Sequence, residues 1–335
     1  MAPQRPGPNR RDFMMSGTAL LAAGRAARAD APLRFAHAYG EAVLPRPARR
    51  VVSLGYNTQD ALLAIGVVPV GIRHWYGNYP DGVWPWAQPL LGDAKPVVMM
   101  GEVSMEVVAG LAPDLIVGIG SAISAEEYAV LSQIAPVLMQ PEGVGTWAAA
   151  WQDTTRILGR ATGREAEAEA SISQTTERFA AARAAHPEWA GKSAVAAWCD
   201  GGQTGIFTGD DTRARFLTDL GFITPEAARD LVTQGGFYAT LSPEDLSPLD
   251  ADLLVWISAS ARATDIADLA MRQTLRAVRD GREIFADEVL SGALSFGSVL
   301  SLPYALDLIE PEIVLATDGD PGTVVPSARM AGLVK

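Results

Sequence analysis

Short apolar runs alternate with amphipathic segments along most of this chain of 335 residues. Such runs are typical of strands that are buried on both faces, and they occur at residues 115–119 and 253–257. Strands are also predicted at residues 51–54, 69–72, 194–198 and 282–285. Two further segments, 58–65 and 212–220, have the composition of helices. Each is followed by a glycine suited to a helix end, Gly66 and Gly221. The alternation of strands and helices predicts parallel α/β lobes.

An internal repeat divides the chain into two halves. Residues 104–117 align without a gap with residues 242–255, and Ser, Glu, Leu, Asp, Leu and Val recur. The serines that open the copies suit a helix N-cap, and a glutamate in the first helical turn is favoured by the helix dipole. These residues are Ser104 and Glu106 in one copy, Ser242 and Glu244 in the other. Each copy therefore predicts a short helix followed by a buried strand.

A helix is predicted between the halves. Segment 164–186 contains neither Gly nor Pro and is rich in Ala and Glu, which are strong helix formers. A flexible linker would instead be rich in Gly and Ser. The predicted fold is α/β, with two pseudo-symmetric lobes joined by one long helix. Its parts are an N-terminal lobe at 30–149, connecting helices at 150–187 and a C-terminal lobe at 188–335.

The first 29 residues have the parts of an export signal in the correct order, with a disordered basic tail as the alternative. Arg10 and Arg11 followed by Phe13 resemble a twin-arginine (Tat) signal, and the apolar stretch 14–24 follows them. That stretch is too short to span a bilayer. No cysteine follows it, so we expect no lipoprotein anchor. We expect cleavage after Ala29 and a periplasmic protein.

Composition and charge exclude several classes of protein. The chain is 48% hydrophobic and 20% charged, which is typical of globular proteins. Its net charge is −12, whereas a nucleic-acid-binding protein is usually basic. Cys199 is the single cysteine, so no disulfide can form within one chain.

Two α/β lobes joined by a long helix, behind an export signal, resemble the class III periplasmic substrate-binding proteins. These serve ABC importers of ferric siderophores, haem and cobalamin. The resemblance rests on the order and spacing of segments 50–54, 106–117, 134–137 and 151–169, and it extends over nearly all of the mature chain. Segments 76–80, 84–86, 294–296 and 300–304 resemble the iron(III)-siderophore branch.

This resemblance implies a binding protein for iron transport rather than an enzyme, with a ligand cleft between its lobes. It implies no resident cofactor, because the ferric siderophore is the transported ligand. Similar proteins dock on a permease dimer through one exposed glutamate per lobe, and we expect this chain to be a monomer. Glu106 and Glu244 occupy the matching positions. The alternative is that both are ordinary glutamates at helix starts.

A ferric siderophore supplies its own oxygen ligands for iron, so its site needs aromatic faces and a few hydrogen-bond donors. Arg serves both purposes, because its planar group donates several bonds and stacks on rings. In the first half, candidates follow strand ends, where α/β folds place ligands, or belong to the aromatic segment 73–91: Tyr56, Arg73, Trp75, Tyr76 and Trp86. In the second half they are Trp198, Arg213, Phe237, Tyr238, Ser295 and Phe296.

The alternative for the aromatic segment is a packed hydrophobic loop. Because only Pro85 separates Trp84 from Trp86, we expect that these two side chains do not both face a core.

Direct metal binding and enzyme activity are poorly supported. The three histidines, His37, His74 and His186, form no set with metal-ligand spacing, although His74 leaves haem ligation open. No phosphate-binding loop, dinucleotide-binding glycine motif or serine nucleophile motif is present. Cys199 follows a strand and is interpreted as a small buried apolar residue. Haem or cobalamin binding is the alternative within the family; an exported α/β enzyme or a cell-envelope interaction domain is the alternative outside it.

Overall fold

Each half of the chain builds one five-stranded sheet. The computed structural model describes residues 1, 3, 31–209, 211–257 and 262–333. The predicted export signal therefore lies outside the described residues, apart from Met1 and Pro3. Residues 32–335 belong to one compact unit, which contains both sheets.

The sheet of the first half is entirely parallel, as predicted. Its order is β5-β4-β3-β6-β7, with β3 at Val51–Ser53, β4 at Gly71–Arg73, β5 at Val97–Met99, β6 at Leu115–Val117 and β7 at Val137–Leu138. It is accompanied by helices α1 (Thr58–Ala64), α2 (Gln88–Leu91), α3 (Met105–Gly110) and α4 (Ala125–Leu131) and by the 3-10 turn η1 (Pro80–Gly82). A separate hairpin, which the sequence patterns did not indicate, pairs β1 (Leu33–His37) with β2 (Gly40–Leu44).

The sheet of the second half is mixed. Its order is β10-β9-β8-β11-β12, with β8 at Ala194–Asp200, β9 at Gln203–Phe207, β10 at Tyr238–Thr240, β11 at Leu253–Ile257 and β12 at Glu283–Ala286. Strands β8, β11 and β12 are parallel, whereas β9 and β10 are antiparallel to their neighbours. The turn between β8 and β9 is tight because Gly201 and Gly202 both have positive φ. The pseudo-symmetry is thus closest in the central strands and breaks at this edge.

The other elements of the second half surround this sheet. Its helices are α7 (Thr212–Asp219), α8 (Glu226–Arg229), α9 (Ala263–Ala267), α10 (Arg276–Arg279), α11 (Glu288–Phe296), α12 (Ser301–Ala316) and α13 (Pro326–Met330). Its 3-10 turns are η2 (Pro187–Trp189), η3 (Ser247–Leu249) and η4 (Arg272–Thr274). None of the described helices combines the length and apolar character that a membrane span requires.

The sequence repeat corresponds to equivalent strands, but its helix forms only once. In the first copy the Ser104 hydroxyl caps α3 by accepting from Val107 N at 3.3 Å. In the second copy the predicted helix after Ser242 is wrong, because the chain makes a turn and then η3. The reason is Pro248, which stands where the first copy has Gly110. A proline inside a helix lacks the N–H and clashes with the preceding turn.

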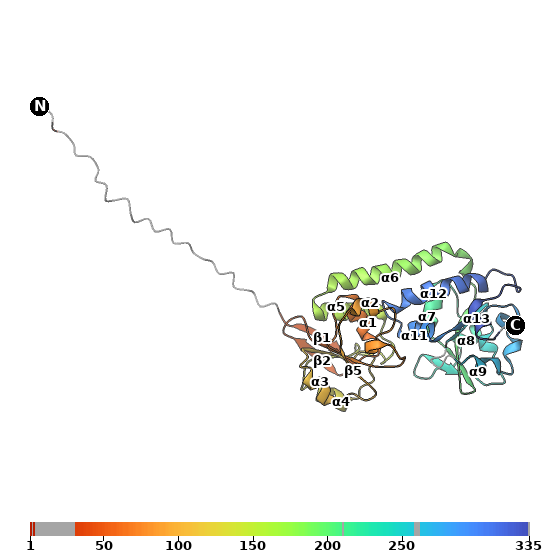
Figure 1. The fold of residues 1–335 in the computed structure, drawn as a ribbon, viewed down its shortest axis with the longest axis horizontal. Coiled ribbons are helices and arrows are strands. Elements are labelled where there is room, and N and C mark those ends of the chain that lie inside the picture. Colours follow the sequence, from red (N-terminus) through yellow and green to blue (C-terminus); the bar gives the residue numbers. More distant parts are fainter. Residues whose placement is uncertain (2, 4–30, 210, 258–261, 334–335) are drawn as a thin grey trace. The chain divides into compact units, whose positions relative to one another are not determined.

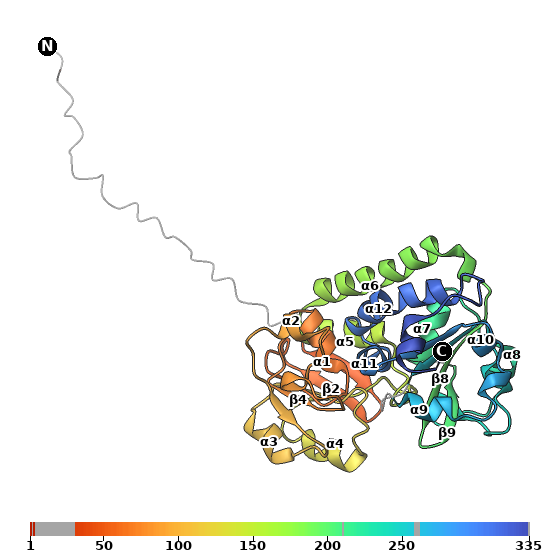
Figure 2. The same ribbon diagram turned by 45° about the vertical axis from the view of Figure 1, so that its right-hand side comes forward.

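Two helices connect the halves, and the predicted long one is confirmed. Helix α5 (Trp151–Thr162) ends at Gly163, whose φ of 68° reverses the chain, and α6 (Glu165–Ala185) follows. Figures 1 and 2 show α6 running along both lobes above α12. Thr175 Oγ1 on α6 donates to Val299 O at 2.9 Å, and Arg178 forms ion pairs with Asp307 and Glu310 on α12. The predicted α/β fold with two joined lobes is confirmed.

The aromatic segment 73–91 divides between the core and the surface. Trp84 and Trp86 are both buried, and their rings stack with centroids 5.0 Å apart. The expectation that they do not both face a core is therefore wrong. The chain turns at Trp84, whose carbonyl accepts from Ala87 N and Gln88 N, so the alternation of an extended strand does not apply. Both indoles pack against Phe296 of the second half, which makes the core continuous between the lobes.

Candidate functional site

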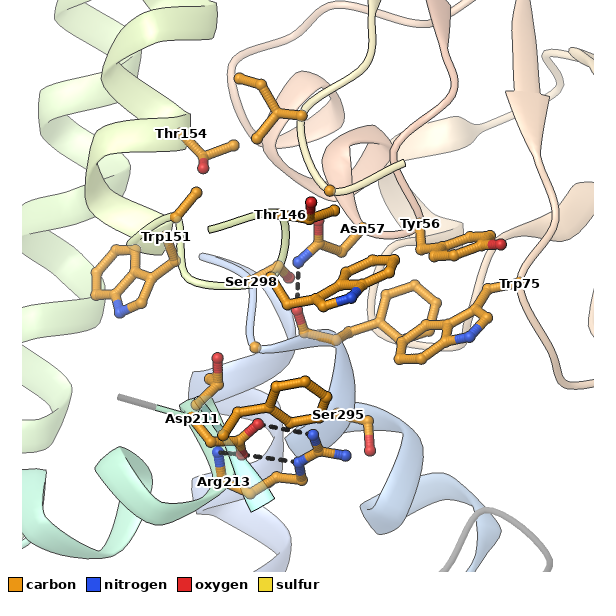
Figure 3. A pocket seen from close by; sticks show the side chains of 18 of the residues that line it. Tyr56, Asn57, Trp75, Thr146, Trp151, Thr154, Asp211, Arg213, Ser295 and Ser298 are labelled. Carbon is orange, nitrogen blue, oxygen red and sulfur yellow. Dashed lines mark hydrogen bonds and ion pairs between the residues drawn. The ribbon is translucent and has the colours of Figure 1, made fainter. Parts of the chain in front are cut away.

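A cavity of about 440 Å³ lies between the two lobes and is walled mainly by aromatic rings. Figure 3 shows part of its lining. The first half of the chain and α5 provide Tyr56, Trp75, Trp147 and Trp151; the second half provides Trp198, Phe207, Phe237, Tyr238 and Phe296. Aromatic rings from both lobes, with a few polar groups among them, are the composition expected of a site for a bulky organic ligand.

Three rings of the first lobe form one stacked group, called the aromatic stack below. Tyr56 lies just after β3, with its ring 5.4 Å from that of Trp75 and 5.7 Å from that of Trp147. The planes are nearly parallel in both pairs, at 19° and 7°. Trp75 is 39% exposed and Trp147 is 48% exposed. Two large indoles thus present apolar surface to the solvent at the cavity, which favours a role in binding.

The end of α11 fixes the opposite wall. Asn57 Nδ2 donates to Phe296 O at 2.6 Å, which ties the first lobe to this helix end. Gly297 follows with φ of 54°, and a Cβ there would come within 2.2 Å of Thr212. The left-handed conformation and the close approach to α7 both require glycine. Ser295 and Phe296 are held at the cavity by these contacts.

A similar close approach positions Trp198 on the second sheet. A Cβ on Gly205 of the neighbouring strand β9 would come within 2.5 Å of the Trp198 indole and 2.3 Å of Ala239 O. Glycine at this position lets the indole lie directly against β9. The ring of Tyr238 on β10 meets it edge-on at 6.1 Å.

The charged residues among the described lining of the cavity form a pair. Asp211 and Arg213 are joined by two hydrogen bonds, Nε to Oδ1 at 2.9 Å and Nη2 to Oδ2 at 2.7 Å. Asp211 is also the N-cap of α7, because its carboxylate accepts from Arg213 N at 2.9 Å. The guanidinium carbon of Arg213 lies 3.7 Å from the centroid of the Phe207 ring. The dashed lines in Figure 3 mark this pair.

Most of the candidates chosen from the sequence line the cavity. The structure brings together Tyr56, Trp75, Trp198, Arg213, Phe237, Tyr238, Ser295 and Phe296. Trp147 was not among the candidates, because it belongs to an irregular segment before α5. Asp211 was not among them either; the signal that could have found it is its N-cap position two residues before Arg213.

Arg73, Tyr76 and Trp86 do not line the cavity. Arg73 lies over the Tyr56 ring, 4.8 Å from its centroid, and donates to the backbone carbonyl oxygens of Gly101 and Ser121 at 3.0 and 2.8 Å. The Tyr76 ring packs against Trp75 and Trp84, and burial raises the pKa of its hydroxyl to about 12. The Trp86 side chain is part of the core.

The buried carboxyl group of Asp60 on α1 connects the two lobes. Its Oδ2 accepts from Trp86 Nε1 at 2.7 Å and from Ser298 Oγ at 2.6 Å. Burial raises the pKa of Asp60 to about 6, and the two hydrogen bonds oppose this shift only in part. Ser298 lines the cavity, so the ionisation of Asp60 is coupled to the joint between the lobes.

Replacing Asp60 by Asn is expected to remove a pH dependence of folding stability. In the folded protein Asp60 keeps its proton to about pH 6, whereas the unfolded chain releases it near the ordinary pKa of 3.8. The folded state therefore binds more protons between these values, and its stability falls as the pH rises through this window. The fall is at most about 3 kcal/mol, since one pKa unit corresponds to about 1.4 kcal/mol. Urea unfolding of wild type and Asp60→Asn at about pH 4 and about pH 7 measures this fall in stability. The prediction would be contradicted if the two proteins differed in stability by the same amount at both pH values.

The residues considered for metal binding or catalysis are dispersed. Among the described residues no group of three or more His, Cys, Asp or Glu side chains could hold a metal ion. His74 bonds to Gly77 O at 2.8 Å and does not line the cavity. Cys199 is buried, and burial raises the pKa of its thiol to about 11. The thiol therefore stays protonated at neutral pH and is a poor nucleophile.

Comparison with known proteins gives consistent matches. The family model for periplasmic binding proteins matches residues 51–290. The probable siderophore-binding lipoprotein YfiY of Bacillus subtilis (strain 168) is 27% identical over 283 residues, which cover 80% of this chain and 83% of that protein. The Fe(3+) dicitrate-binding periplasmic protein FecB of Escherichia coli (strain K12) is 33% identical over 142 residues, 42% of this chain and 46% of FecB.

Among solved structures, a periplasmic solute binding protein from Mycobacterium smegmatis (strain MC2 155) superposes with a TM-score of 0.76 at 34% sequence identity. The match covers 86% of this chain and 99% of that protein.

Proposed function

The chain belongs to the periplasmic binding protein family, and from this premise we propose that it captures a ferric siderophore and delivers it to an ABC permease for iron uptake. The observation that carries this proposal is the cavity between the lobes, with the exposed indoles of Trp75 and Trp147 on one wall. YfiY and FecB, whose names describe binding of a siderophore and of ferric dicitrate, support it.

The remaining parts of the proposal follow from the same premise. These relatives are binding proteins. The protonated thiol of Cys199 does not support the alternative of an enzyme that uses this cysteine as its nucleophile. We propose that the protein has no catalytic activity, acts as a monomer and needs no cofactor. It is exported by the twin-arginine signal of residues 1–29 and works in the periplasm. Haem binding through His74 is disfavoured, because the imidazole bonds to a backbone carbonyl outside the cavity.

Titration of the protein with ferric siderophores, haem and cobalamin tests the proposed function. Trp75 and Trp147 are half-exposed at the cavity, so a bound ferric chelate is expected to quench tryptophan fluorescence. We expect saturable quenching by at least one ferric siderophore at micromolar concentration or below. Quenching by haem or cobalamin alone would transfer the proposal to those ligands, and no response to any ferric chelate would refute it.

The permease is expected to recognise Glu106 and Glu244. Both side chains are exposed, one in each lobe, and they occupy matching positions in the sequence repeat. Pairing with basic groups of a two-fold permease would use one glutamate from each lobe. We expect the double variant Glu106→Ala/Glu244→Ala to bind its ligand normally and to lose at least about 90% of the uptake of radioactive iron, a loss of the size expected when charged pairs at an interface are broken.

Glu165 and Glu226 provide the matched control. Each is an exposed glutamate in the first turn of a helix, so the variant Glu165→Ala/Glu226→Ala makes the same change of charge at other places. It is expected to keep normal uptake. Equal uptake by the two double variants would rule out the assigned docking role.

A further inference from the structure

The charge of the cavity bears on which ferric chelates it accepts. The described lining contains one carboxylate and one guanidinium, and they are bonded to each other. The side chains of Arg213 and Asp211 are only 18% and 8% exposed. A pair held in a poorly solvated place is costly to break, because each partner would be left without compensation. Arg213 is therefore not free to neutralise an anionic ligand.

Resting on the proposed function, we propose that the cavity selects ferric chelates of zero net charge, such as trihydroxamates, over anionic catecholate and carboxylate chelates. Three singly charged hydroxamates cancel the charge of Fe³⁺, whereas three doubly charged catecholates leave an excess negative charge. Burying that excess charge without an available cation costs several kcal/mol.

The other polar groups of the lining suit a neutral ligand. Thr146, Thr154 and Ser295, which Figure 3 labels, contribute neutral hydroxyl side chains to the lining. Hydroxyl groups can donate to the oxygen atoms of a hydroxamate and require no opposite charge. The aromatic stack supplies flat apolar surface for the remainder of the ligand. The lining thus offers dispersion contacts and neutral hydrogen bonds in place of positive charge.

Two further electrostatic contributions come from outside the cavity lining: the positive charge of Arg73 and the negative net charge of the whole chain. The Arg73 guanidinium lies over the Tyr56 ring but outside the lining, and two backbone carbonyl oxygens already accept from it. The net charge of the whole chain, −12, repels anions at long range. Neither supplies the cavity with an unpaired positive group.

The test measures the affinities of wild type and of Asp211→Asn for three ferric complexes. These are ferrichrome, a neutral trihydroxamate; ferric enterobactin, an anionic tricatecholate; and ferric dicitrate. Asn caps a helix as well as Asp does, so the variant keeps the start of α7 while leaving Arg213 with an uncompensated charge. Wild type is expected to bind the neutral complex at least about 10-fold more tightly than either anion, as expected for an unpaired buried charge. In Asp211→Asn this preference is expected to fall at least about 10-fold.

Asp287→Asn is the matched control. Asp287 is also the N-cap of a helix, α11, where it accepts from Leu290 N at 2.9 Å. It is exposed and does not line the cavity. This variant changes the total charge equally and should keep the wild-type preference.

Two results would overturn the selectivity while leaving the proposed function in place. One is tighter binding of an anionic complex by wild type; the other is an equal preference for the neutral complex in Asp211→Asn and Asp287→Asn. Binding of none of the three complexes by wild type would overturn the selectivity, and failure of the wider siderophore titration would then refute the proposed function itself.

Discussion

Replacing Trp75 and Trp147 together by alanine is expected to weaken ligand binding about 100- to 1,000-fold while the protein remains folded. Each indole is an aromatic group of the kind that dominates binding energies, with about 2 kcal/mol or more lost on truncation. Both are partly exposed, so they contribute less to the folded state than buried side chains. Fluorescence quenching is unsuitable for a variant lacking these reporters. Isothermal titration calorimetry with the best ferric siderophore measures the loss directly.

Tyr39 supplies a control for the general effect of removing an exposed ring. It is 38% exposed and packs against Tyr128 rather than the cavity. Tyr39→Ala should bind with the affinity of wild type, and thermal unfolding of all three proteins checks that the folds are intact. An affinity loss below about 3-fold in the double tryptophan variant, well under the effect of one hot-spot residue, would mean that the aromatic stack is not the ligand surface.

The part of the site that could be predicted from the sequence lies mainly next to regular strands. Tyr56 follows β3 and Trp198 lies on β8, and the positions of these strands were evident from their apolar runs. The ends of parallel strands meet at one edge of a sheet, so side chains there converge even when they are far apart in sequence. Trp75 was found for the same reason.

The rest of the site could not be predicted, because it depends on irregular backbone and on ion pairing between side chains. Trp147 belongs to a segment without periodicity, so nothing in its neighbours indicates where its ring lies. Trp86 was misassigned because a turn places both it and Trp84 in the core. Arg213 was correctly placed at the cavity, but its charge was taken as available to a ligand. The bonds from Asp211 that neutralise it depend on side-chain conformation, which residue types alone do not specify.

The free energy of unfolding is expected to fall by about 3–5 kcal/mol when Glu283 is replaced by Gln, the usual cost of breaking a buried ion pair from one side. The side chains of Glu283 and Arg272 are 1% and 3% exposed, and two hydrogen bonds join them at 3.0 and 2.5 Å. Glu283 also accepts from Trp256 Nε1 at 2.9 Å, and Arg272 donates to Leu333 O at 2.8 Å. Glutamine has nearly the same volume but cannot balance the guanidinium, so Arg272 would remain buried with an unpaired charge.

Urea unfolding measures this loss, and the exposed pair of Asp250 and Arg276 provides the comparison. These side chains are 37% and 45% exposed, so Asp250→Asn should cost about 1 kcal/mol or less. The double variant Arg272→Met/Glu283→Leu should recover only part of the stability, because it removes the unpaired charge but leaves Trp256 Nε1 and Leu333 O without their partners. A loss in Glu283→Gln no larger than that in Asp250→Asn would show that the buried pair does not hold η4 and residue 333 against β12.

The network supports β11 and β12, and β11 pairs with β8, the strand that bears Trp198. Its loss is therefore also expected to lower ligand affinity as unfolding becomes appreciable.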